Sequence, residues 1–219
     1  HRVLKTDIKK DPYPQEDEII FGCGCFWGAE KCFWKLPGVV TTSVGYAGGD
    51  KSNPTYYEVC SGLTGHSEVV RVIWNKSEID ISDLLKMFWE CHNPTQKNRQ
   101  GNDIGTQYRS AIYYKNESNK NIILASKKQY QNELDKKNFG VIETEIKMID
   151  NYFYAEQYHQ QYLASPGSRQ YCSASPTKVK LEDFDGSNFK LKENVWENFD
   201  WEVDKCVLRS DNNPIKNFS

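Results

Sequence analysis

Short apolar segments separated by polar stretches rich in Gly, Pro and Asn run along most of this chain. β-branched and aromatic residues concentrate in five of them, which predicts strands near 18–22, 39–46, 66–74, 108–114 and 144–149. Helical spacing elsewhere predicts helices over 26–35, 117–137 and 154–163, and one that contains Leu84, Leu85, Phe88 and Trp89. We expect Ser82 or Asp83 to cap that last helix. A long loop is expected through 53–56.

Strands and helices mix without strict alternation, which favours an α+β fold over a doubly wound sheet. We expect a central mixed β-sheet flanked by helices, with a ferredoxin-like βαβ core and a long irregular C-terminal segment. The chain divides into a polar N-terminal lead over 1–17, an α+β domain over 18–164 and a C-terminal segment over 165–219. Because 165–219 holds few periodic runs, we expect it to wrap over the domain.

Composition narrows the class of protein. The 219 residues are 38% hydrophobic and 13% aromatic, which is ample for a packed core. Lys and Arg total 28 against 30 for Asp and Glu, with no basic cluster longer than a pair. This balance predicts no nucleic-acid partner and no membrane surface, and no apolar run approaches the ~18 residues of a membrane span. We expect a monomer.

Seven cysteines are an odd number in a chain too large to depend on disulfides, so we expect mostly reduced thiols and a cytoplasmic location. A mitochondrial or secreted protein stays an alternative, because the chain begins at His1 and a leader segment would then have been removed. Cys23-Gly24-Cys25 lacks the two-residue gap of a chelating pair, so we expect no metal site. Cys32, Cys60 and Cys91 are expected in the core.

Residues 22–28 read Gly-Cys-Gly-Cys-Phe-Trp-Gly directly after an apolar run, which places a thiol at a strand-to-helix turn beside two aromatic rings. We select Cys25 as the nucleophile, because Cys23 still belongs to the strand. Unpaired N–H groups and the positive end of the helix dipole are expected to lower the pKa of the Cys25 thiol from ~8.5 into the physiological range. Two buried structural cysteines are the alternative interpretation.

A proton donor for this thiol is harder to select. Glu68 alternates with Val70, Val72 and Trp74, so burial would raise the pKa of its carboxyl and keep it protonated near neutrality. The opposite face is apolar too, and Glu68 at an exposed strand start is an equal alternative. Tyr56 and Tyr108 offer phenolic donors, although most tyrosines serve packing. Three histidines offer a rival acyl-transfer mechanism without a local signature: His66, His92 and His159.

Several short motifs follow one another between about residues 18 and 175. They are Gly24-Cys25-Phe26-Trp27-Gly28, Gly45-Tyr46-Ala47-Gly48-Gly49, Asn53-Pro54-Thr55-Tyr56, Cys60-Ser61-Gly62, Thr64-Gly65-His66-Ser67-Glu68, Gln100-Gly101-Asn102-Asp103-Ile104-Gly105-Thr106-Gln107-Tyr108-Arg109-Ser110, and Tyr154-Ala155-Glu156 with Tyr158-His159-Gln160. In this order they resemble the peptide-methionine (S)-S-oxide reductase family, the A-type methionine sulfoxide reductases.

The resemblance implies a role for each matching residue. Phe26 and Trp27 would hold the S-methyl group of methionine sulfoxide, free or in oxidised proteins, while Glu68, Tyr56 and Tyr108 would hydrogen-bond its oxygen. Attack by Cys25, with a proton from Glu68, would leave a sulfenic acid on that cysteine. The remaining residues that the resemblance assigns are Asp103, which orders the site, and Cys172, which resolves the sulfenic acid.

Recycling would use thiols alone. Thioredoxin, or dithiothreitol in its place, would reduce the disulfide of Cys172, so the resemblance implies no cofactor. Cys206 is a possible second recycling thiol, because the tail after Cys172 departs from the pattern of many family members. Two other classes remain as alternatives: a cysteine-dependent hydrolase or transferase that pairs Cys25 with a histidine, and a noncatalytic module whose Phe26-Trp27 cleft binds peptides.

Overall fold

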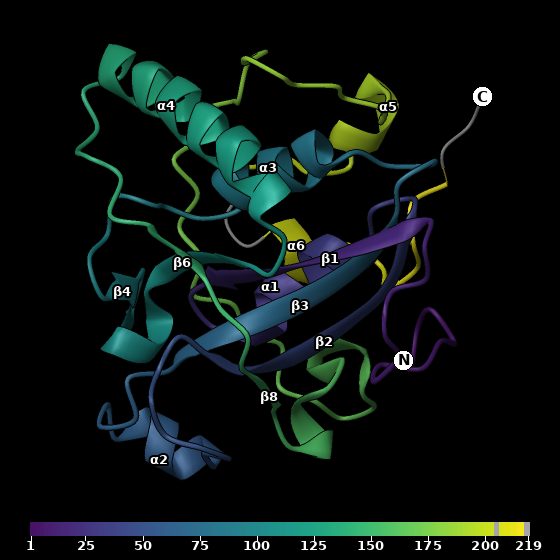
Figure 1. Ribbon diagram of the computed structural model, residues 1–219, viewed down its shortest axis with the longest axis vertical. Coiled ribbons are helices and arrows are strands. Elements are labelled where there is room, and N and C mark those ends of the chain that lie inside the picture. Colours follow the sequence, from purple (N-terminus) through teal and green to yellow (C-terminus); the bar gives the residue numbers. More distant parts are fainter. Residues whose placement is uncertain (204–205, 217–219) are drawn as a thin grey trace.

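A six-stranded sheet forms the centre of the molecule in the computed structural model, which describes residues 1–203 and 206–216 except the side chain of Cys206 (Figure 1). Its strands are β1 (Glu16–Cys23), β2 (Val39–Ala47), β3 (Ser67–Asn75), β6 (Ser110–Tyr114), β7 (Glu145–Met148) and β8 (Tyr152–Tyr154). They lie in the order β7-β6-β1-β3-β2-β8. The pair β6–β7 is parallel and the other pairs are antiparallel, so the sheet is mixed as predicted.

The ferredoxin-like core is confirmed by the connections between these strands. Helix α1 (Phe26–Trp34) joins β1 to β2, and helix α3 (Ile81–Glu90) leads from β3 toward β6. Because β3 lies between β1 and β2, and β1 lies between β3 and β6, two split βαβ units interleave. A small separate ladder pairs β4 (Arg99–Gln100) with β5 (Asp103–Ile104).

The helices cover one face of the sheet. Phe21 of β1 stacks on Phe33 of α1 and Phe88 of α3, with ring centroids 4.8 and 5.1 Å apart. The 3-10 turn η2 (Glu117–Asn119) and helix α4 (Lys120–Lys136), which together occupy the predicted helix over 117–137, pack on α3 through Tyr130 and Trp89. The opposite face buries a smaller cluster that includes Ile20, Val69, Ala111 and Tyr113. Alternating side chains of one strand therefore enter two cores.

Two boundaries differ from the prediction. The side chain of Asp80 accepts from the backbone N–H of Ser82 and Asp83 accepts from that of Asp80, so the cap of α3 is Asp80 and the prediction of Ser82 or Asp83 is wrong. The loop expected through 53–56 ends early, because a second capping box, of Thr55 and Glu58, starts helix α2 (Tyr56–Cys60).

The helix predicted over 154–163 is also wrong. Gln160 exchanges side-chain hydrogen bonds with both backbone groups of Val44, and Gln161 adopts a left-handed φ of 47° while its N–H donates to Glu30. These tertiary contacts outweigh helical spacing. The segment instead contains the end of β8 and the 3-10 turns η3 (Gln157–His159) and η4 (Tyr162–Ala164).

The C-terminal segment lies over the helical layer. The N–H of Leu181 donates to Glu90 of α3, and the N–H groups of Lys190 and Leu191 donate to Asp83. Beyond them the segment contains only short helices among its described residues, namely α5 (Glu193–Trp196) and α6 (Cys206–Arg209). The long irregular segment expected from the sequence is present, and its backbone bonds to buried carboxylates fix its path.

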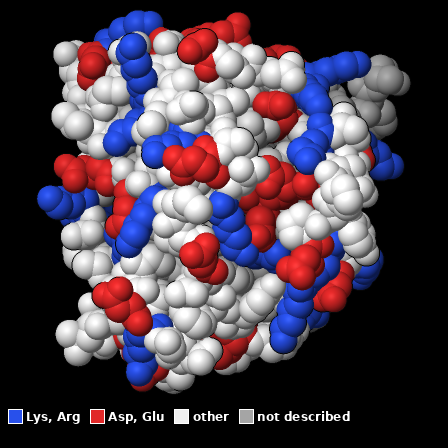
Figure 2. Space-filling view, viewed as in Figure 1, with Lys and Arg blue, Asp and Glu red and all other residues white. Residues whose placement is uncertain are grey.

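The face in Figure 2 carries acidic and basic side chains interspersed with uncharged ones. A mixed surface of this kind creates no extended field of one sign. Among the helices of the described residues, none combines the length and the apolar character needed to cross a bilayer.

Candidate active site

The turn between β1 and α1 places Cys25 at the start of a helix. Cys25 occupies the N-cap position of α1, and Gly24 before it has a φ of 88°, which L side chains rarely adopt. The backbone N–H of Phe26 donates to Oε2 of Glu68 at 3.1 Å. The N–H of Trp27 interacts with the Cys25 sulfur. The free N–H groups at the helix start are thus shared between a thiol and a carboxyl.

One pocket of about 70 Å³ collects most residues predicted for the site. It is lined by Cys25, Phe26, Trp27, Tyr56, Glu68, Asp103, Tyr108 and Tyr171. These residues come from α1, α2, β3, β5, the 3-10 turn η1 (Thr106–Tyr108) and the C-terminal segment. A thiol, two carboxyl groups and three phenols therefore converge beside an aromatic wall.

The prediction for the ionisation of Cys25 is wrong in direction. Burial, together with the negative charge of Glu68, raises the pKa of the Cys25 thiol well above its ordinary value. The interaction with the Trp27 N–H lowers that pKa, as the helix position predicts, but it is the weaker influence. Cys25 consequently carries its proton in the free protein at neutral pH.

Glu68 is buried rather than at an exposed strand start. Glu68 lies on β3 and is only 2% exposed. Burial raises the pKa of its carboxyl to about 8, and the charge of Asp103 contributes further to this rise. The hydrogen bond from the Phe26 N–H opposes this rise. At neutral pH the carboxyl is therefore mostly protonated and can donate a proton.

The two phenols stay protonated for the same reason. Burial raises the pKa of both Tyr56 and Tyr108 above the ordinary value of a tyrosine. Glu156 positions Tyr56, because its carboxylate accepts from the Tyr56 backbone N–H at 2.9 Å and from the Tyr46 hydroxyl at 2.8 Å. The pocket therefore offers neutral hydroxyl donors beside Glu68.

The Trp27 indole is held from three sides. Its Nε1 donates to Nδ1 of His159 at 3.1 Å, and the ring of Tyr162 stacks on it with centroids 3.9 Å apart. Tyr171 meets the indole edge-on at 6.4 Å, and its hydroxyl donates to Asp103 at 2.6 Å. The sequence prediction missed Tyr162 and Tyr171; the position of Tyr171 directly before Cys172 was the available signal.

Cys172 lies behind the pocket, against the first turn of α1. Its Sγ would be 2.5 Å from a Cβ placed on Gly28, so only a glycine leaves room for it there. Electrostatic interaction with Cys172 also raises the pKa of Cys25, which places the two thiols near each other. The predicted recycling role of Cys206 lies outside the described residues, because the side chain of that residue is not described.

No histidine among the described residues hydrogen-bonds the Cys25 sulfur. Nε2 of His66 donates to the carbonyl of Lys51 at 2.7 Å, and Nε2 of His92 is bonded to Ser110 at 2.7 Å. His159 bonds the indole of Trp27. These rings have structural partners, so the geometry does not favour a cysteine–histidine pair.

The remaining cysteines divide into two groups. Cys23, Cys32 and Cys91 are buried, as predicted for the latter two. Cys60 is exposed, so its assignment to the core is wrong. It lies at the end of α2, one turn after Tyr56, whose hydroxyl interacts with the Cys60 sulfur.

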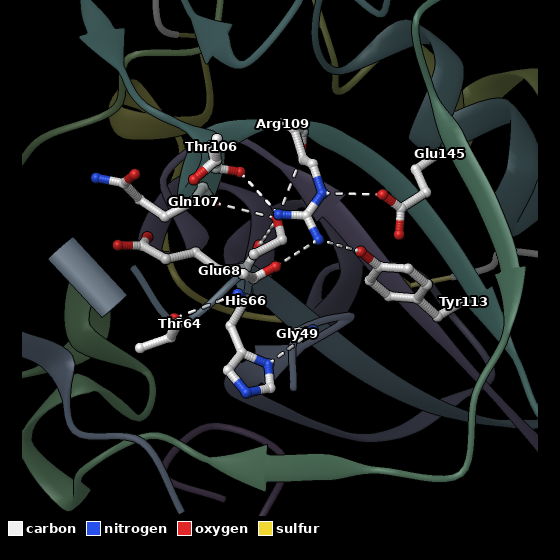
Figure 3. Close-up of polar contacts among 11 residues, drawn as sticks. Gly49, Thr64, His66, Glu68, Thr106, Gln107, Arg109, Tyr113 and Glu145 are labelled. Atoms are coloured by element: carbon white, nitrogen blue, oxygen red, sulfur yellow. Dashed lines mark hydrogen bonds and ion pairs between the residues drawn. The ribbon is translucent and has the colours of Figure 1, made fainter. Parts of the chain in front are cut away.

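Arg109 ties together the loops around the site (Figure 3). Its guanidinium donates to the Thr106 carbonyl at 2.9 Å, the Gly65 carbonyl at 3.0 Å and the Tyr113 hydroxyl at 2.8 Å, and it pairs with Glu145 at 3.2 Å. Thr106 starts the turn that carries Tyr108, and Gly65 precedes the strand that carries Glu68. Arg109 thus fixes both segments relative to the sheet.

Replacing Arg109 with lysine should lower the free energy of unfolding by about 1–3 kcal/mol, because a lysine keeps the charge but cannot serve four acceptors on two sides. Urea denaturation measures this change. Arg109→Met should cost more, since Glu145 then loses its ion partner. Equal denaturation midpoints for the parent and both variants would show that the loops are held by other contacts.

Comparisons with known proteins identify the family of this chain. The family model described as peptide methionine sulfoxide reductase matches residues 17–193. Peptide methionine sulfoxide reductase MsrA of Vibrio vulnificus is 54% identical over 179 residues, which cover 82% of this chain and 85% of the relative. The MsrA of Ectopseudomonas mendocina is 55% identical over 183 residues, 83% of this chain and 82% of the relative.

Solved structures show the same fold. Methionine sulfoxide reductase A of Corynebacterium diphtheriae superposes with a TM-score of 0.71 at 40% identity, over 84% of this chain and 89% of that one. Mxr1 of Saccharomyces cerevisiae in reduced form superposes with a TM-score of 0.66 at 32% identity, over 79% of this chain and 96% of that one. The chain therefore belongs to the peptide methionine sulfoxide reductase family, the family of oxidoreductases that its motifs predict.

Proposed function

We propose that this chain reduces the S epimer of methionine sulfoxide, free or in oxidised proteins, with Cys25 as the nucleophile. One observation carries the proposal: Cys25, the protonated Glu68 and an aromatic wall share a single small pocket. The wall suits a methyl group, and the hydroxyl donors suit the sulfoxide oxygen. A pocket with these two sides discriminates between sulfur epimers, because exchanging methyl and oxygen leaves a buried donor unpaired.

The first step transfers oxygen from substrate to enzyme. Phe26 and Trp27 hold the methyl group, while Tyr56, Tyr108 and Glu68 hydrogen-bond the oxygen and make the sulfur electrophilic. The Cys25 sulfur attacks that sulfur, Glu68 protonates the oxygen, and the thiol proton returns to Glu68. The oxygen, now a hydroxyl, then becomes bonded to the Cys25 sulfur as the new S–S bond and the sulfoxide S–O bond both break, so methionine leaves as a thioether and Cys25 becomes a sulfenic acid.

The second step returns Cys25 to the thiol. The Cys172 thiol condenses with the sulfenic acid, which releases water and forms a Cys25–Cys172 disulfide. Thioredoxin, or dithiothreitol, then reduces that disulfide by thiol exchange, with Cys206 as a possible intermediate thiol. The thiols supply both electrons, so the cycle requires no cofactor. Reduced thiols of this kind fit the cytoplasm.

Consumption of each sulfur epimer tests the proposal. N-acetylated methionine sulfoxide is incubated with the protein and dithiothreitol, and the two epimers are separated chromatographically. Loss of the S epimer alone is expected. Turnover of neither epimer combined with cleavage of an activated ester would favour the hydrolase, and binding without turnover would favour the peptide-binding module.

Replacing Cys172 with alanine should separate the two steps. The variant should still release about one methionine per chain, because formation of the sulfenic acid needs only Cys25. Turnover driven by thioredoxin should stop, since no disulfide forms. A burst measurement followed by a multiple-turnover assay checks both results. Undiminished turnover would identify Cys206 or another thiol as the resolver.

A further inference from the structure

A buried carboxyl that the proposed reaction does not use lies one helical turn after Trp27. Glu30 of α1 is fully buried, with an exposure of 0%. Its carboxylate accepts from the Thr42 hydroxyl at 3.0 Å, the Gln161 side-chain amide at 2.7 Å and the Gln161 backbone N–H at 2.8 Å. Thr42 belongs to β2, and Gln161 lies between the turns η3 and η4. Glu30 therefore joins three separate segments of the chain.

The partners of Glu30 require a group that only accepts hydrogen bonds. Oε1 accepts from Thr42 and from the Gln161 side chain, while Oε2 accepts from the Gln161 backbone. Burial raises the pKa of this carboxyl to about 7, and the three hydrogen bonds oppose the rise because they stabilise the charged form. Complete burial of an ionisable group is costly, so we expect it to serve more than packing.

Gln161 has a backbone conformation that needs support from its surroundings. Its φ of 47° lies in the left-handed region, which residues other than glycine rarely enter. Such a conformation persists where neighbouring contacts fix it. The Gln161 side-chain oxygen accepts from the Arg2 N–H at 3.0 Å, and Glu30 binds both the backbone and the side chain. Glu30 is therefore a principal support of this left-handed turn.

The turn at Gln161 joins the two residues that hold the Trp27 indole from the same segment. Tyr162, directly after Gln161, stacks on the indole with ring centroids 3.9 Å apart. His159, two positions before Gln161, accepts from the indole Nε1 at 3.1 Å. A change of φ at Gln161 would redirect the chain that follows and move Tyr162 away from the indole.

We propose that Glu30 is a positioning residue that orients the Trp27 indole for the methyl group of the substrate. Glu30 holds the left-handed turn at Gln161, the turn places Tyr162 against the indole, and the indole lines the pocket. Glu30 and Trp27 are three positions apart on α1, so the indole and its support are fixed to the same helix. The inference rests on the proposed function, in which this wall binds the methyl group.

Replacing Glu30 with glutamine tests this role with little change of shape. In either orientation the new amide points its NH₂ group at a donor of Gln161, so one hydrogen bond becomes a contact between two donors. The substrate concentration that gives the half-maximal rate of the methionine burst should rise at least ~10-fold. The maximal burst rate should stay within ~3-fold of the parent, because Glu30 touches none of the reacting atoms. A single-turnover measurement without reductant isolates this step from recycling.

Exchange of the two side chains provides a rescue. In the double variant Glu30→Gln with Gln161→Glu, the amide at position 30 donates to the carboxylate at position 161. Its oxygen accepts from the backbone N–H at position 161, and the Thr42 hydroxyl can accept in place of donating. The half-maximal concentration should return to within ~3-fold of the parent. A folded double variant as impaired as Glu30→Gln would contradict the proposal.

Asp83→Asn is the matched control. Asp83 is also fully buried and accepts from backbone N–H groups of a distant segment, those of Lys190 and Leu191, but it lies outside the pocket lining. The substitution should lower the midpoint of urea denaturation and leave the half-maximal substrate concentration unchanged. An equal rise of that concentration in Asp83→Asn and Glu30→Gln would show a general effect of lost stability and overturn the positioning role.

The indole N–H resonance of Trp27 gives a readout that needs no activity. The chain contains six tryptophans, and isotopically labelled tryptophan makes their indole N–H signals visible by NMR. Trp27→Phe identifies the relevant signal by its loss. We expect Glu30→Gln to shift or broaden this signal, the double variant to restore it, and Asp83→Asn to leave it in place. An unmoved signal in a folded Glu30→Gln chain would overturn the proposal.

A second variant covers the case in which Glu30→Gln does not fold. Gln161→Ala removes the side-chain hydrogen bond to Glu30 and keeps the backbone one, so a smaller rise of the half-maximal concentration and a smaller shift of the Trp27 signal are expected. Parent-like values of both in the folded Gln161→Ala chain would contradict the proposal.

Failure of the proposed function and failure of this inference give different results. A parent chain that releases no methionine would contradict the reductase, and the Trp27 resonance would still test the link from Glu30 to the indole. A parent chain that releases methionine, together with a folded Glu30→Gln chain of ordinary half-maximal concentration, would contradict the positioning role alone.

Discussion

Replacing Cys25 with serine should reduce the turnover of methionine sulfoxide by more than ~10⁴-fold. A serine hydroxyl can neither attack sulfur at a useful rate nor take up oxygen to form an acid that Cys172 resolves. The substitution keeps the N-cap position of α1 and nearly the same volume, so the fold should persist. Turnover with dithiothreitol measures the loss, and circular dichroism checks the fold.

Cys60→Ser is the matched control for this variant. Cys60 is exposed, and a serine hydroxyl can keep its interaction with the Tyr56 hydroxyl, so the substitution should leave turnover close to that of the parent. A Cys25→Ser chain that retains a substantial rate, or a Cys60→Ser chain that loses it, would transfer the nucleophile to another thiol. Either result would remove the basis of the proposed mechanism.

Replacing Glu68 with glutamine should lower the rate by ~10²–10⁴-fold, because an amide has the shape of the carboxyl but cannot transfer its proton. The pH profile gives an independent check. The carboxyl has a pKa of about 8, so it loses its proton as the pH rises through that value and the parent rate should fall there. In Glu68→Gln this alkaline decline should disappear. An unchanged rate or an identical profile would exclude Glu68 as the acid.

The same substitution should stabilise the folded chain in alkali. Burial raises the pKa of Glu68 from 4.5 to about 8, so between these pH values the folded state keeps a proton that the unfolded state has lost. Stability therefore decreases as the pH rises through this interval, and Glu68→Gln avoids that loss. At pH ~9 the variant should have a higher free energy of unfolding than the parent, by several kcal/mol at most, as measured by urea denaturation. A Glu68→Gln variant that is less active but more stable than the parent would be typical of the loss of a functional carboxyl.

The pattern of apolar and polar residues predicted the central strands and helices, because burial of their faces imposes that pattern on the sequence. β1 and β3 alternate between the two cores, and α3 buries the face that carries Leu84 and Phe88. The helix expected over 154–163 failed because Gln160 pairs with Val44, more than 100 positions away in the sequence. A contact at that separation leaves no trace in helical spacing.

In the site too, local sequence predicted some features, and contacts between distant residues determined the others. Motifs identified Cys25, Glu68 and the aromatic wall, and the fold brings them into one pocket. The direction of the Cys25 pKa could not be predicted, because the helix position was visible in the sequence while the burial and the nearby Glu68 charge were not.

A mass-spectrometric map of the disulfide formed after one turnover tests the central claim most directly, because it identifies nucleophile and resolver together. The reduced protein is treated with one equivalent of methionine sulfoxide without reductant, alkylated and digested. The account predicts a peptide pair joined by Cys25 and Cys172. A disulfide that lacks Cys25, or a sulfenic acid trapped on Cys60 while Cys25 stays a thiol, would contradict it.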